Sequence, residues 1–509
     1  MNTLNLSQLA GELRTHDIAC EVHGEADPAV GGTACDSRAV RAGDLFVCKG
    51  AAFRPAFLTS AREAGAVAYL ADADKLGELA SAEPGLPALC VPADQLRRAM
   101  AVASAVAAGR PDRDLPIVGI TGTKGKTTCA YMLRSIFDHA RGTGRCGIIG
   151  TVETYDGVED GPSRNTTPES PDLWRHLSNA RDARLGGLVM EVSSQALKYD
   201  RTYGVDLAVG CFLNIGLDHI SPVEHKDFED YFTSKLKIFE QCRCAMVNLD
   251  SDHADRVLAA AQAGCAERVL TFGLGREDAY AWASDLHATE LGVSFTLHLG
   301  DEERSAALPF PGDFSVSNAL CAAICAEELG LSIDEIVAGL AVTHVPGRME
   351  FYRSADGRVT AVVDYAHNRL AFESLLSAIK GTFADVEKIA VFGAVGGKAI
   401  ERRRDLPEVA AKYADRIILT TDDPWTEDPA DICRQMEEAL PVGFPHETVL
   451  DRAAAIDRAF DLAEKCGRRA VVMLLGKGSD ATQHVANGYE DVETDSVLAA
   501  RHIAAHDAR

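Results

Sequence analysis

Short apolar runs alternate with helical stretches along most of the chain, and the pattern changes twice. Residues 1–110 hold short alternating segments, residues 111–343 combine strand-like runs with a longer helix, and residues 344–509 alternate strands and helices again. The apolar runs of this third block are Val359–Val363, Lys388–Phe392, Arg416–Thr420 and Ala470–Leu475. Short apolar strands separated by helices are typical of parallel sheets covered by helices. We therefore predict an α/β protein of three domains, 1–110, 111–343 and 344–509, as its 509 residues also suggest.

The most informative pattern lies at the start of the second block. An apolar run, Ile117–Thr121, stops at a glycine-rich turn, and a helical stretch over Cys129–Phe137 follows. Backbone N–H groups of such a turn and the helix N-terminus bind polyphosphates. Lys126 would reach the β- and γ-phosphates, and the Thr127 hydroxyl would bind Mg²⁺. The predicted ATP-binding residues are Gly122, Thr123, Lys124, Gly125, Lys126, Thr127 and Thr128.

Composition narrows the possible functions. The net charge of −25 argues against a nucleic-acid surface, which needs clustered Lys and Arg. The first ten residues lack the plan of a signal peptide, and no apolar run approaches the 18 residues of a membrane span. The 14 cysteines are scattered without a CxxC pair, which favours reduced core thiols in a cytoplasmic protein.

Polar residues follow two other predicted strands of the central block. Glu191 ends the apolar run Leu188–Val192, and Asn214 and His219 follow the run Leu207–Leu213. The carboxyl ends of parallel strands meet at one edge of a sheet, where a carboxylate can bind a nucleotide-bound metal. The alternatives are a solvated strand end for Glu191 and a structural role for His219.

Two further positions gain meaning only from their surroundings. Lys235, in a helix predicted from about Phe228 to Gln241, has the composition of an ordinary helix lysine paired with Asp230 or Tyr231 one turn earlier. Arg348 follows the central block, at a domain junction, where its guanidinium could bind a transferring phosphoryl group. Asp364 and His367 end another apolar run, where a ribose or phosphate could bind, although a surface turn explains each of these residues equally well.

Eight short motifs in register give the chain a close resemblance to the Mur ligases. They run from about residue 35 to the C-terminus. Within the family, the chain resembles most closely the UDP-N-acetylmuramoyl-tripeptide synthetase branch, which adds the third residue of the peptidoglycan stem. The motifs are Asp36–Arg38, Gly122–Thr127, Asn165–Pro168, Glu191–Ser194, Asp218–His219, Pro346–Glu350, Asp364–His367 and Gly476–Gly478.

The resemblance implies three domains: an N-terminal UDP-binding α/β domain, a central phosphate-loop ATPase domain with a parallel sheet, and a C-terminal Rossmann-like domain that binds the amino acid. It assigns the UDP-sugar to Ser37, Asn165, Thr166, Thr167, Ser193 and Arg201. Beyond the phosphate loop it assigns ATP to Asn318, Arg348, Asp364 and His367. Ser315 is a mild departure, since the family more often has asparagine there.

The same resemblance implies the metal site and the catalytic groups. Magnesium ligands would be Thr127, Glu191, His219 and Lys235, the last modified to N6-carboxylysine. A carbamate turns the lysine cation into an anionic oxygen ligand, which Mg²⁺ prefers. The implied catalytic residues are Lys126, Lys235, His219 and Arg348.

The implied reaction forms an amide through an acyl phosphate. The carboxylate of UDP-N-acetylmuramoyl-dipeptide attacks the γ-phosphoryl group of ATP, and the amine of an amino acid then displaces phosphate. The resemblance further implies a cytoplasmic monomer that acts in peptidoglycan synthesis and thereby in cell shape and division.

The amino acid is suggested by one loop. Members that add meso-diaminopimelate read Asp-Asn-Pro-Arg, whereas this chain reads Asp422 to Trp425, with Asp423 in place of the amide and Trp425 in place of the arginine. The later Gly476 motif ends in Asp480. A pocket lined by Asp423 and Asp480 favours a terminal ammonium, so we expect L-lysine, with ornithine and meso-diaminopimelate as rivals. Trp425 as a merely packed loop residue would leave the choice open.

Two other classes of function share parts of this pattern. A ligase that extends folate with glutamate has the same phosphate loop, but the Asp36–Arg38 and Thr166–Pro168 motifs argue against it. A catalytically silent scaffold is the other alternative. The joint presence of four residues argues against it, namely Lys126, Glu191, Lys235 and Arg348.

Overall fold

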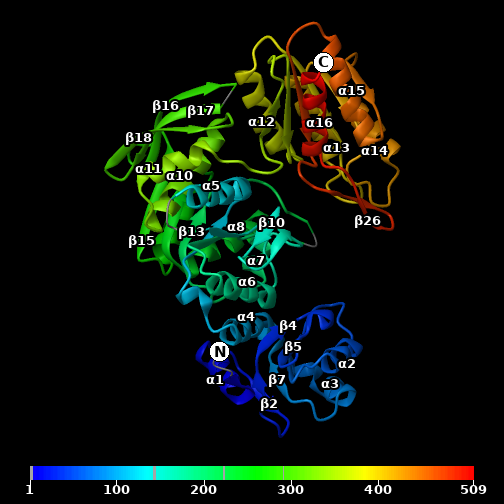
Figure 1. Ribbon diagram of the computed structural model, residues 1–509. Helices are drawn as coiled ribbons and strands as arrows, with labels where there is room; N and C mark the ends of the chain where they lie inside the picture. The colour runs from blue at the N-terminus through cyan, green and yellow to red at the C-terminus, as the bar shows by residue number, and fades with distance from the viewer. Residues whose placement is uncertain (1–3, 141–144, 222–223, 291) are drawn as a thin grey trace. The chain divides into compact units, whose positions relative to one another are not determined.

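The computed structural model describes residues 4–140, 145–221, 224–290 and 292–509 (Figure 1). Contacts between Cα atoms group the chain into two compact units, which are described separately. Unit 1 contains Met1–Trp282 and Leu320–Ile336, and unit 2 contains Ala283–Ala319 and Val337–Arg509. The predicted α/β class is confirmed, because both units combine largely parallel sheets with helices. The predicted boundaries near residues 110 and 343 stay a prediction.

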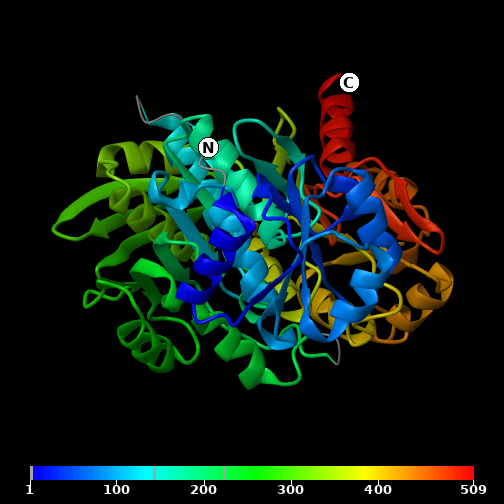
Figure 2. The same ribbon diagram turned by 90° about the horizontal axis from the view of Figure 1, so that it is seen from below.

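The N-terminal sheet of unit 1 has the strand order β2-β7-β6-β5-β4. Its strands are β2 (Glu21–His23), β4 (Gly32–Ala34), β5 (Asp44–Cys48), β6 (Ala68–Asp72) and β7 (Ala88–Val91). Helices α1 (Leu6–Thr15) and α4 (Leu96–Ala107) pack an apolar cluster on one face, and α2 (Pro55–Glu63) and α3 (Leu76–Ala82) pack a second (Figure 2). Burial of both faces explains why β5 reads as a continuous apolar run.

The second sheet of unit 1 carries the phosphate loop, and its strands in this unit follow the order β11-β10-β9-β12-β8-β13-β14-β15. These strands are β8 (Ile117–Thr121), β9 (Cys146–Ile149), β10 (Glu153–Tyr155), β11 (Asp160–Pro162), β12 (Gly187–Glu191), β13 (Leu207–Phe212), β14 (Cys242–Asn248) and β15 (Arg268–Leu274). From β9 to β15 the neighbours are parallel, so the loops after β8, β12 and β13 meet at one edge.

The helices of this second sheet come from the segments between its strands. They are α5 (Lys126–His139), α6 (Ser170–Asp182), α7 (Ser194–Lys198), α8 (Phe228–Leu236) and α9 (Ala254–Ala263). The helix predicted to run to Gln241 is shorter, because α8 ends at Leu236 and a 3-10 turn, Lys237–Glu240, follows. No described helix is long and apolar enough to cross a membrane.

Unit 2 is built on a sheet with the order β19-β20-β24-β21-β22-β23. Its strands are β19 (Glu350–Arg353), β20 (Val359–Asp364), β21 (Glu387–Phe392), β22 (Arg416–Leu419), β23 (His446–Thr448) and β24 (Ala470–Leu475). Only β19 is antiparallel to its neighbour. The four apolar runs predicted for this block are therefore confirmed as parallel strands β20, β21, β22 and β24.

The other elements of unit 2 are helices and pairs of antiparallel strands. The helices are α12 (Arg369–Thr382), α13 (Arg402–Tyr413), α14 (Pro429–Glu437), α15 (Arg452–Lys465) and α16 (Asp495–Asp507). Short ribbons are formed by β17 (Gly292–Leu299) with β18 (Glu302–Leu308) and by β25 (Thr482–Val485) with β26 (Gly488–Asp491). The helix α10 (Asp313–Glu328) contributes to both units.

Candidate active site

The turn between β8 and α5 has the backbone of a phosphate-binding loop. Gly122 and Gly125 have φ values of 155° and 88°, which side chains rarely allow, and α5 begins at Lys126. A Cβ atom at Gly122 would also lie 2.9 Å from Cβ of Leu213. The predicted strand, loop and helix are thus present, with the helix N-terminus directed at the loop.

Asn214, directly after β13, holds the loop in place. The backbone N–H of Thr123 donates to the Asn214 carbonyl oxygen at 3.0 Å, and that of Lys124 donates to the Asn214 side chain at 2.9 Å. The Asn214 amide donates back to the carbonyl oxygen of Lys124 at 3.0 Å. This reciprocal pairing fixes the loop before any phosphate binds, which is the preorganisation that electrostatic catalysis needs.

Three lysines reach the same loop. Lys126 Nζ donates to the carbonyl oxygen of Gly122 at 2.9 Å, and Lys235 Nζ donates to the same oxygen at 2.9 Å. Lys124 pairs with Asp218 at 3.2 Å, and although burial raises the pKa of that carboxyl, Lys124 and His219 together lower it. The loop therefore gathers three amino groups inside a protein of net charge −25.

Lys235 is not the ordinary helix lysine that the composition of its helix suggested. Its side chain is fully buried, and its Nζ lies 4.7 Å from the ring centroid of Tyr231 one turn earlier. Burial, followed by repulsion from Lys126 and Lys124, lowers its pKa well below the usual range. The Asp230 carboxylate, the other predicted partner, pairs with Lys198 at 2.6 Å.

Glu191 ends β12 next to the phosphate loop, as the strand pattern predicted. Its buried carboxylate accepts hydrogen bonds from the Thr127 hydroxyl at 3.0 Å and from the backbone N–H of Thr151 at 2.8 Å. A Cβ atom at Gly150 would lie 2.5 Å from this carboxylate. Thr127 and Glu191 thus present two hard oxygen donors side by side, a set that fits Mg²⁺.

His219 approaches from a different segment, after β13. It has a φ of 57°, its ring is half-exposed, and its Nδ1 lies 3.1 Å from the Glu224 carboxylate. The ring also lies 5.9 Å from that of Tyr231, whose hydroxyl group is 3.0 Å from the Thr123 hydroxyl. Its surroundings connect it to the phosphate loop through Tyr231, which the sequence indicated only as a partner of Lys235.

The predicted UDP-sugar residues fall into one cluster and one separate turn. The Thr167 hydroxyl donates to the carbonyl oxygen of Glu191 at 2.8 Å and accepts from the backbone N–H of Ser193 at 3.0 Å. Arg201 donates to the carbonyl oxygen of Thr167 at 3.2 Å, and the Thr166 hydroxyl lies 3.0 Å from that of Thr151. The exposed Asn165 adjoins this cluster in sequence.

Ser37 lies outside that cluster, in the turn after β4. Contacts between the N-terminal sheet and the Thr167 segment converge instead on Glu169. Its carboxylate pairs with Lys49 at 3.1 Å, Arg97 at 3.4 Å and Arg201 at 2.9 Å. Glu169 directly follows the Asn165–Pro168 motif, but the cations that surround it are far apart in sequence, so the pattern of the chain gave no signal for this group.

Unit 2 holds the other predicted nucleotide residues. Asp364, at the end of β20, accepts from the backbone N–H groups of Met349 at 2.8 Å and Ala366 at 2.7 Å. The Arg348 guanidinium lies 4.8 Å from the ring centroid of Tyr365, and His367 donates to the carbonyl oxygen of Tyr365 at 2.7 Å. Asn318 is buried in α10. The structure therefore groups Arg348, Asp364 and His367 around one strand end.

Two of the residues predicted to bind the substrate amino acid, Asp423 and Asp480, contact the same lysine, which was not among the predicted site residues. Lys477 donates to the Asp423 carboxylate at 2.9 Å and to the Asp480 carboxylate at 2.8 Å, and its side chain is buried. Although burial disfavours the cation, Asp422, Asp480 and Asp423 together raise the pKa of Lys477. Asp423 and Asp480 thus share one cation, and the pair with Lys477 keeps one net negative charge.

Trp425 is neither fully packed nor freely exposed. Its φ is 52°, its ring is 45% exposed, and it stacks on His484 with ring centroids 5.9 Å apart. A Cβ atom at Gly397 would lie 2.2 Å from the indole, so the ring covers that glycine. Gly476 directly follows β24 and has a φ of 106°. It donates its N–H to the carbonyl oxygen of Asp364 at 3.0 Å, which connects the Gly476 motif to the end of β20.

Two family models match the chain. The Mur ligase middle domain matches residues 120–326, and the Mur ligase, glutamate ligase domain matches residues 347–478. The first match includes the phosphate loop, Glu191 and Lys235. The second runs from the Arg348 motif to the Gly476 motif.

Relatives and solved structures agree with these models. The chain is 36% identical to a UDP-N-acetylmuramoyl-L-alanyl-D-glutamate–L-lysine ligase of Enterococcus faecalis, covering 91% of this chain and 90% of that one. It is 35% identical to a UDP-N-acetylmuramyl-tripeptide synthetase of Bifidobacterium longum, covering 89% and 88%.

Among solved structures, a UDP-N-acetylmuramoyl-L-alanyl-D-glutamate–2,6-diaminopimelate ligase matches over 99% of both chains, with 26% identity and a TM-score of 0.68. A folylpolyglutamate synthase of Mycobacterium tuberculosis, 19% identical with a TM-score of 0.60, covers 74% of this chain and 92% of its own. The chain belongs to the Mur ligase family and is an ATP-dependent amide ligase.

Proposed function

We propose that this ligase joins L-lysine to UDP-N-acetylmuramoyl-L-alanyl-D-glutamate during peptidoglycan synthesis, as a cytoplasmic monomer. The relative of Enterococcus faecalis carries that activity in its name. The observation that supports the ATP-dependent step most strongly is the loop in which Lys126 and Lys235 converge on the Gly122 carbonyl oxygen, beside the Thr127 and Glu191 pair. Cations and hard oxygen donors in one place suit a metal-bound polyphosphate.

In this proposal the phosphate loop serves the first half-reaction. The carboxylate of the UDP-dipeptide attacks the γ-phosphoryl group of ATP, giving an acyl phosphate and ADP. Lys126 and the N–H groups at the start of α5 offset the charge that develops on the phosphoryl oxygens. Thr127, Glu191 and His219 would hold Mg²⁺, which supplies further charge neutralisation and orients the phosphates. By the resemblance to the family, Asn318, Arg348, Asp364 and His367 would also contact the nucleotide.

The state of Lys235 makes a chemical modification part of the proposal. Only a neutral amine adds to CO₂, giving a carbamate and one proton, and burial among cations lowers the pKa of this amine. The product, N6-carboxylysine, would place anionic oxygens among Lys124 and Lys126 and offer Mg²⁺ a further ligand.

The UDP-sugar would bind on the Thr167 side of Glu191. Thr167, Ser193 and Arg201 are already linked by hydrogen bonds there, and the Thr166 hydroxyl is hydrogen-bonded to that of Thr151. Asn165 adjoins them, and Ser37 would contact the same substrate from the N-terminal sheet.

L-lysine is favoured over meso-diaminopimelate by the charge of the amino-acid loop. Asp423 and Asp480 together outweigh the single charge of Lys477, and Trp425 stands where an arginine would bind a second carboxylate. Ornithine, with the same terminal ammonium, is the nearer rival. Extension of folate is the weaker alternative, because the folylpolyglutamate synthase match leaves about a quarter of this chain uncovered.

The test is phosphate release with ATP, Mg²⁺ and UDP-N-acetylmuramoyl-L-alanyl-D-glutamate in the presence of each amino acid in turn. L-lysine should give the largest kcat/KM, followed by ornithine. A larger value for meso-diaminopimelate would overturn the amino-acid assignment but not the ligase. A melting temperature raised by folate and unaffected by the UDP-dipeptide would overturn both.

A further inference from the structure

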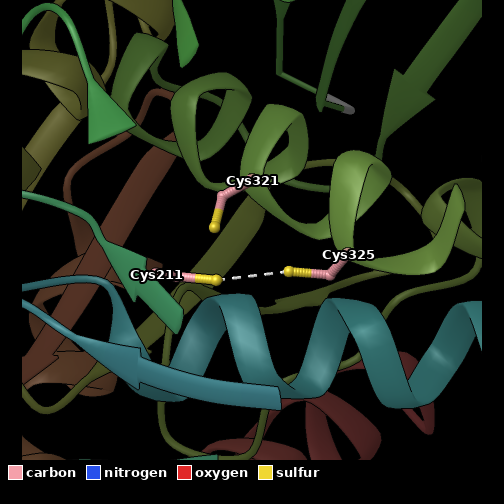
Figure 3. A group of neighbouring side chains, drawn as sticks. All are labelled: Cys211, Cys321 and Cys325. Atoms are coloured by element: carbon pink, nitrogen blue, oxygen red, sulfur yellow. Dashed lines mark hydrogen bonds between the residues drawn. The ribbon is translucent and has the colours of Figure 1, made fainter. Parts of the chain in front are cut away.

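Four sulfur atoms meet in the core of unit 1, directly behind the phosphate loop. The Cys211 Sγ and Cys325 Sγ atoms are 3.4 Å apart, and each lies 3.6 Å from the Met246 Sδ atom. The Sγ atoms of Cys211, Cys321 and Cys325 all lie within 4.8 Å of one another. Figure 3 shows the three cysteine side chains pointing toward one spot, from β13 and from successive turns of α10.

This grouping comes from separate elements of the fold. Cys211 lies on β13 opposite Ile120 of β8, one residue before the strand passes into the phosphate loop. Cys321 and Cys325 are one helical turn apart on α10, and Met246 lies on β14 beside Cys211. Cys129 of α5 adds a further thiol next to Cys321. The sequence predicts reduced thiols scattered through the core, and such thiols need not lie close to one another.

The separations suit shared coordination of one ion. Sulfur atoms bound at about 2.3 Å to one metal lie about 3.8 to 4.0 Å apart in tetrahedral or trigonal geometry. The observed 3.4 and 3.6 Å separations and the 4.8 Å limit bracket that range.

The donor set selects the kind of ion. Three thiols and a thioether are soft donors, and all three cysteines are fully buried. Hard ions such as Mg²⁺ require oxygen ligands, and a thioether is a poor ligand for Zn²⁺. Monovalent copper prefers thiolate and thioether sulfur.

We propose that Cys211, Cys321, Cys325 and Met246 form a buried binding site for Cu(I). Each thiol that becomes a thiolate ligand releases one proton, and no electron is transferred. The bound ion would join β13, β14 and α10 behind the phosphate loop, and so stabilise unit 1.

The experiment uses the full chain under anaerobic, reducing conditions, with Cu(I) supplied from a chromophoric Cu(I) chelator. The wild type should withdraw an equimolar amount of copper from the chelator, develop ultraviolet thiolate-to-copper absorption and melt at a higher temperature. Cys325→Ala and Cys211→Ala should each weaken copper binding by at least about a hundredfold, since each removes a direct ligand.

The matched control is Cys48→Ala, which removes a thiol equally buried in the N-terminal sheet. It should bind copper like the wild type. Melting curves of the copper-free variants establish that each is folded, and Cys321→Ala or Met246→Leu replaces any variant that is not. Equal copper binding by folded Cys325→Ala, failure of the wild type to compete with the chelator, or retention of zinc in preference to copper would each overturn the proposal.

Discussion

Two buried lysines, one in each unit, show how surroundings give the same residue opposite properties. Lys235 lies beside Lys126 and Lys124, against the Tyr231 ring, and its pKa is lowered well below the usual range. Lys477 lies between Asp423 and Asp480, and its pKa is raised. The first environment favours a neutral amine that can react, and the second favours a permanent cation that organises a loop.

The difference shows which buried lysine lowers the folding stability of its unit and which one raises it. Burying an amine without a carboxylate partner is unfavourable, and such groups persist where they serve chemistry. A lysine bridging two carboxylates instead satisfies three buried or half-buried charges at once. We infer that the buried lysine beside the phosphate loop of unit 1 serves the reaction, whereas the buried lysine of unit 2 fixes the conformation and the charge of the Asp423 loop.

The largest effect should come from Lys126, the cation at the start of α5. In Lys126→Ala, phosphate release should fall by more than about a hundredfold, because stabilisation of the γ-phosphoryl charge is lost. The melting temperature should change little. Activity within a few-fold of the wild type would show that Lys126 takes no part in the reaction. Lys235 would then be the only lysine of the phosphate loop with a proposed chemical role.

Lys235→Ala should reduce ligation by a comparable factor, about a hundredfold, because a metal ligand is lost. Added short carboxylates should restore part of the activity by replacing the carbamate oxygens. Lys237→Ala, two residues further along and half-buried, is the matched control and should remain active. An unmodified Lys235 by mass spectrometry, together with a fully active alanine variant, would refute the carbamate.

The Asp423 loop should control amino-acid choice. The wild type should prefer L-lysine to meso-diaminopimelate by at least about tenfold in kcat/KM, which corresponds to roughly 1.4 kcal/mol. The double variant Asp423→Asn, Trp425→Arg should narrow that ratio, because it removes one negative charge and supplies a guanidinium. Asp431→Asn in α14 makes the same charge change at an exposed site and should leave the ratio unaltered.

The smallest effects concern stability, where the two lysines should respond in opposite directions. Lys235→Met should raise the melting temperature and Lys477→Met should lower it, by roughly 2–4 °C for each kcal/mol. In carbonate-depleted buffer the unfolded chain protonates Lys235 more readily than the folded chain does. The wild type therefore gains stability relative to Lys235→Met as pH rises toward the ordinary lysine pKa of about 10.4.

Lys477 should show no such dependence over the same interval. Its folded pKa is raised, so its contribution is fully present below the ordinary lysine value and is lost only as pH rises through the folded value. Melting curves of the wild type and both variants across this range test the sign. A gap between wild type and Lys235→Met that stays constant with pH would contradict the lowered pKa.

Much of the fold follows from local pattern. Strands β8, β12, β13, β20, β21, β22 and β24 were predicted within one or two residues, because parallel strands buried on both faces read as continuous apolar runs. The phosphate loop and the position of Glu191 were predicted for a related reason. A glycine-rich turn after an apolar run, and a carboxylate at the end of such a run, can both be recognised directly from the order of residues.

The chain by itself thus determined the class of fold, the strand ends at which chemistry occurs and, through motif order, the family. Tertiary structure alone decided that Lys235 is buried among cations, that Lys477 neutralises part of the acidic loop, and that Cys211, Cys321 and Cys325 converge on one point. The reason is physical. Local sequence sets backbone conformation, whereas burial and charge depend on residues brought close from distant parts of the chain, and these set the reactivity of a side chain.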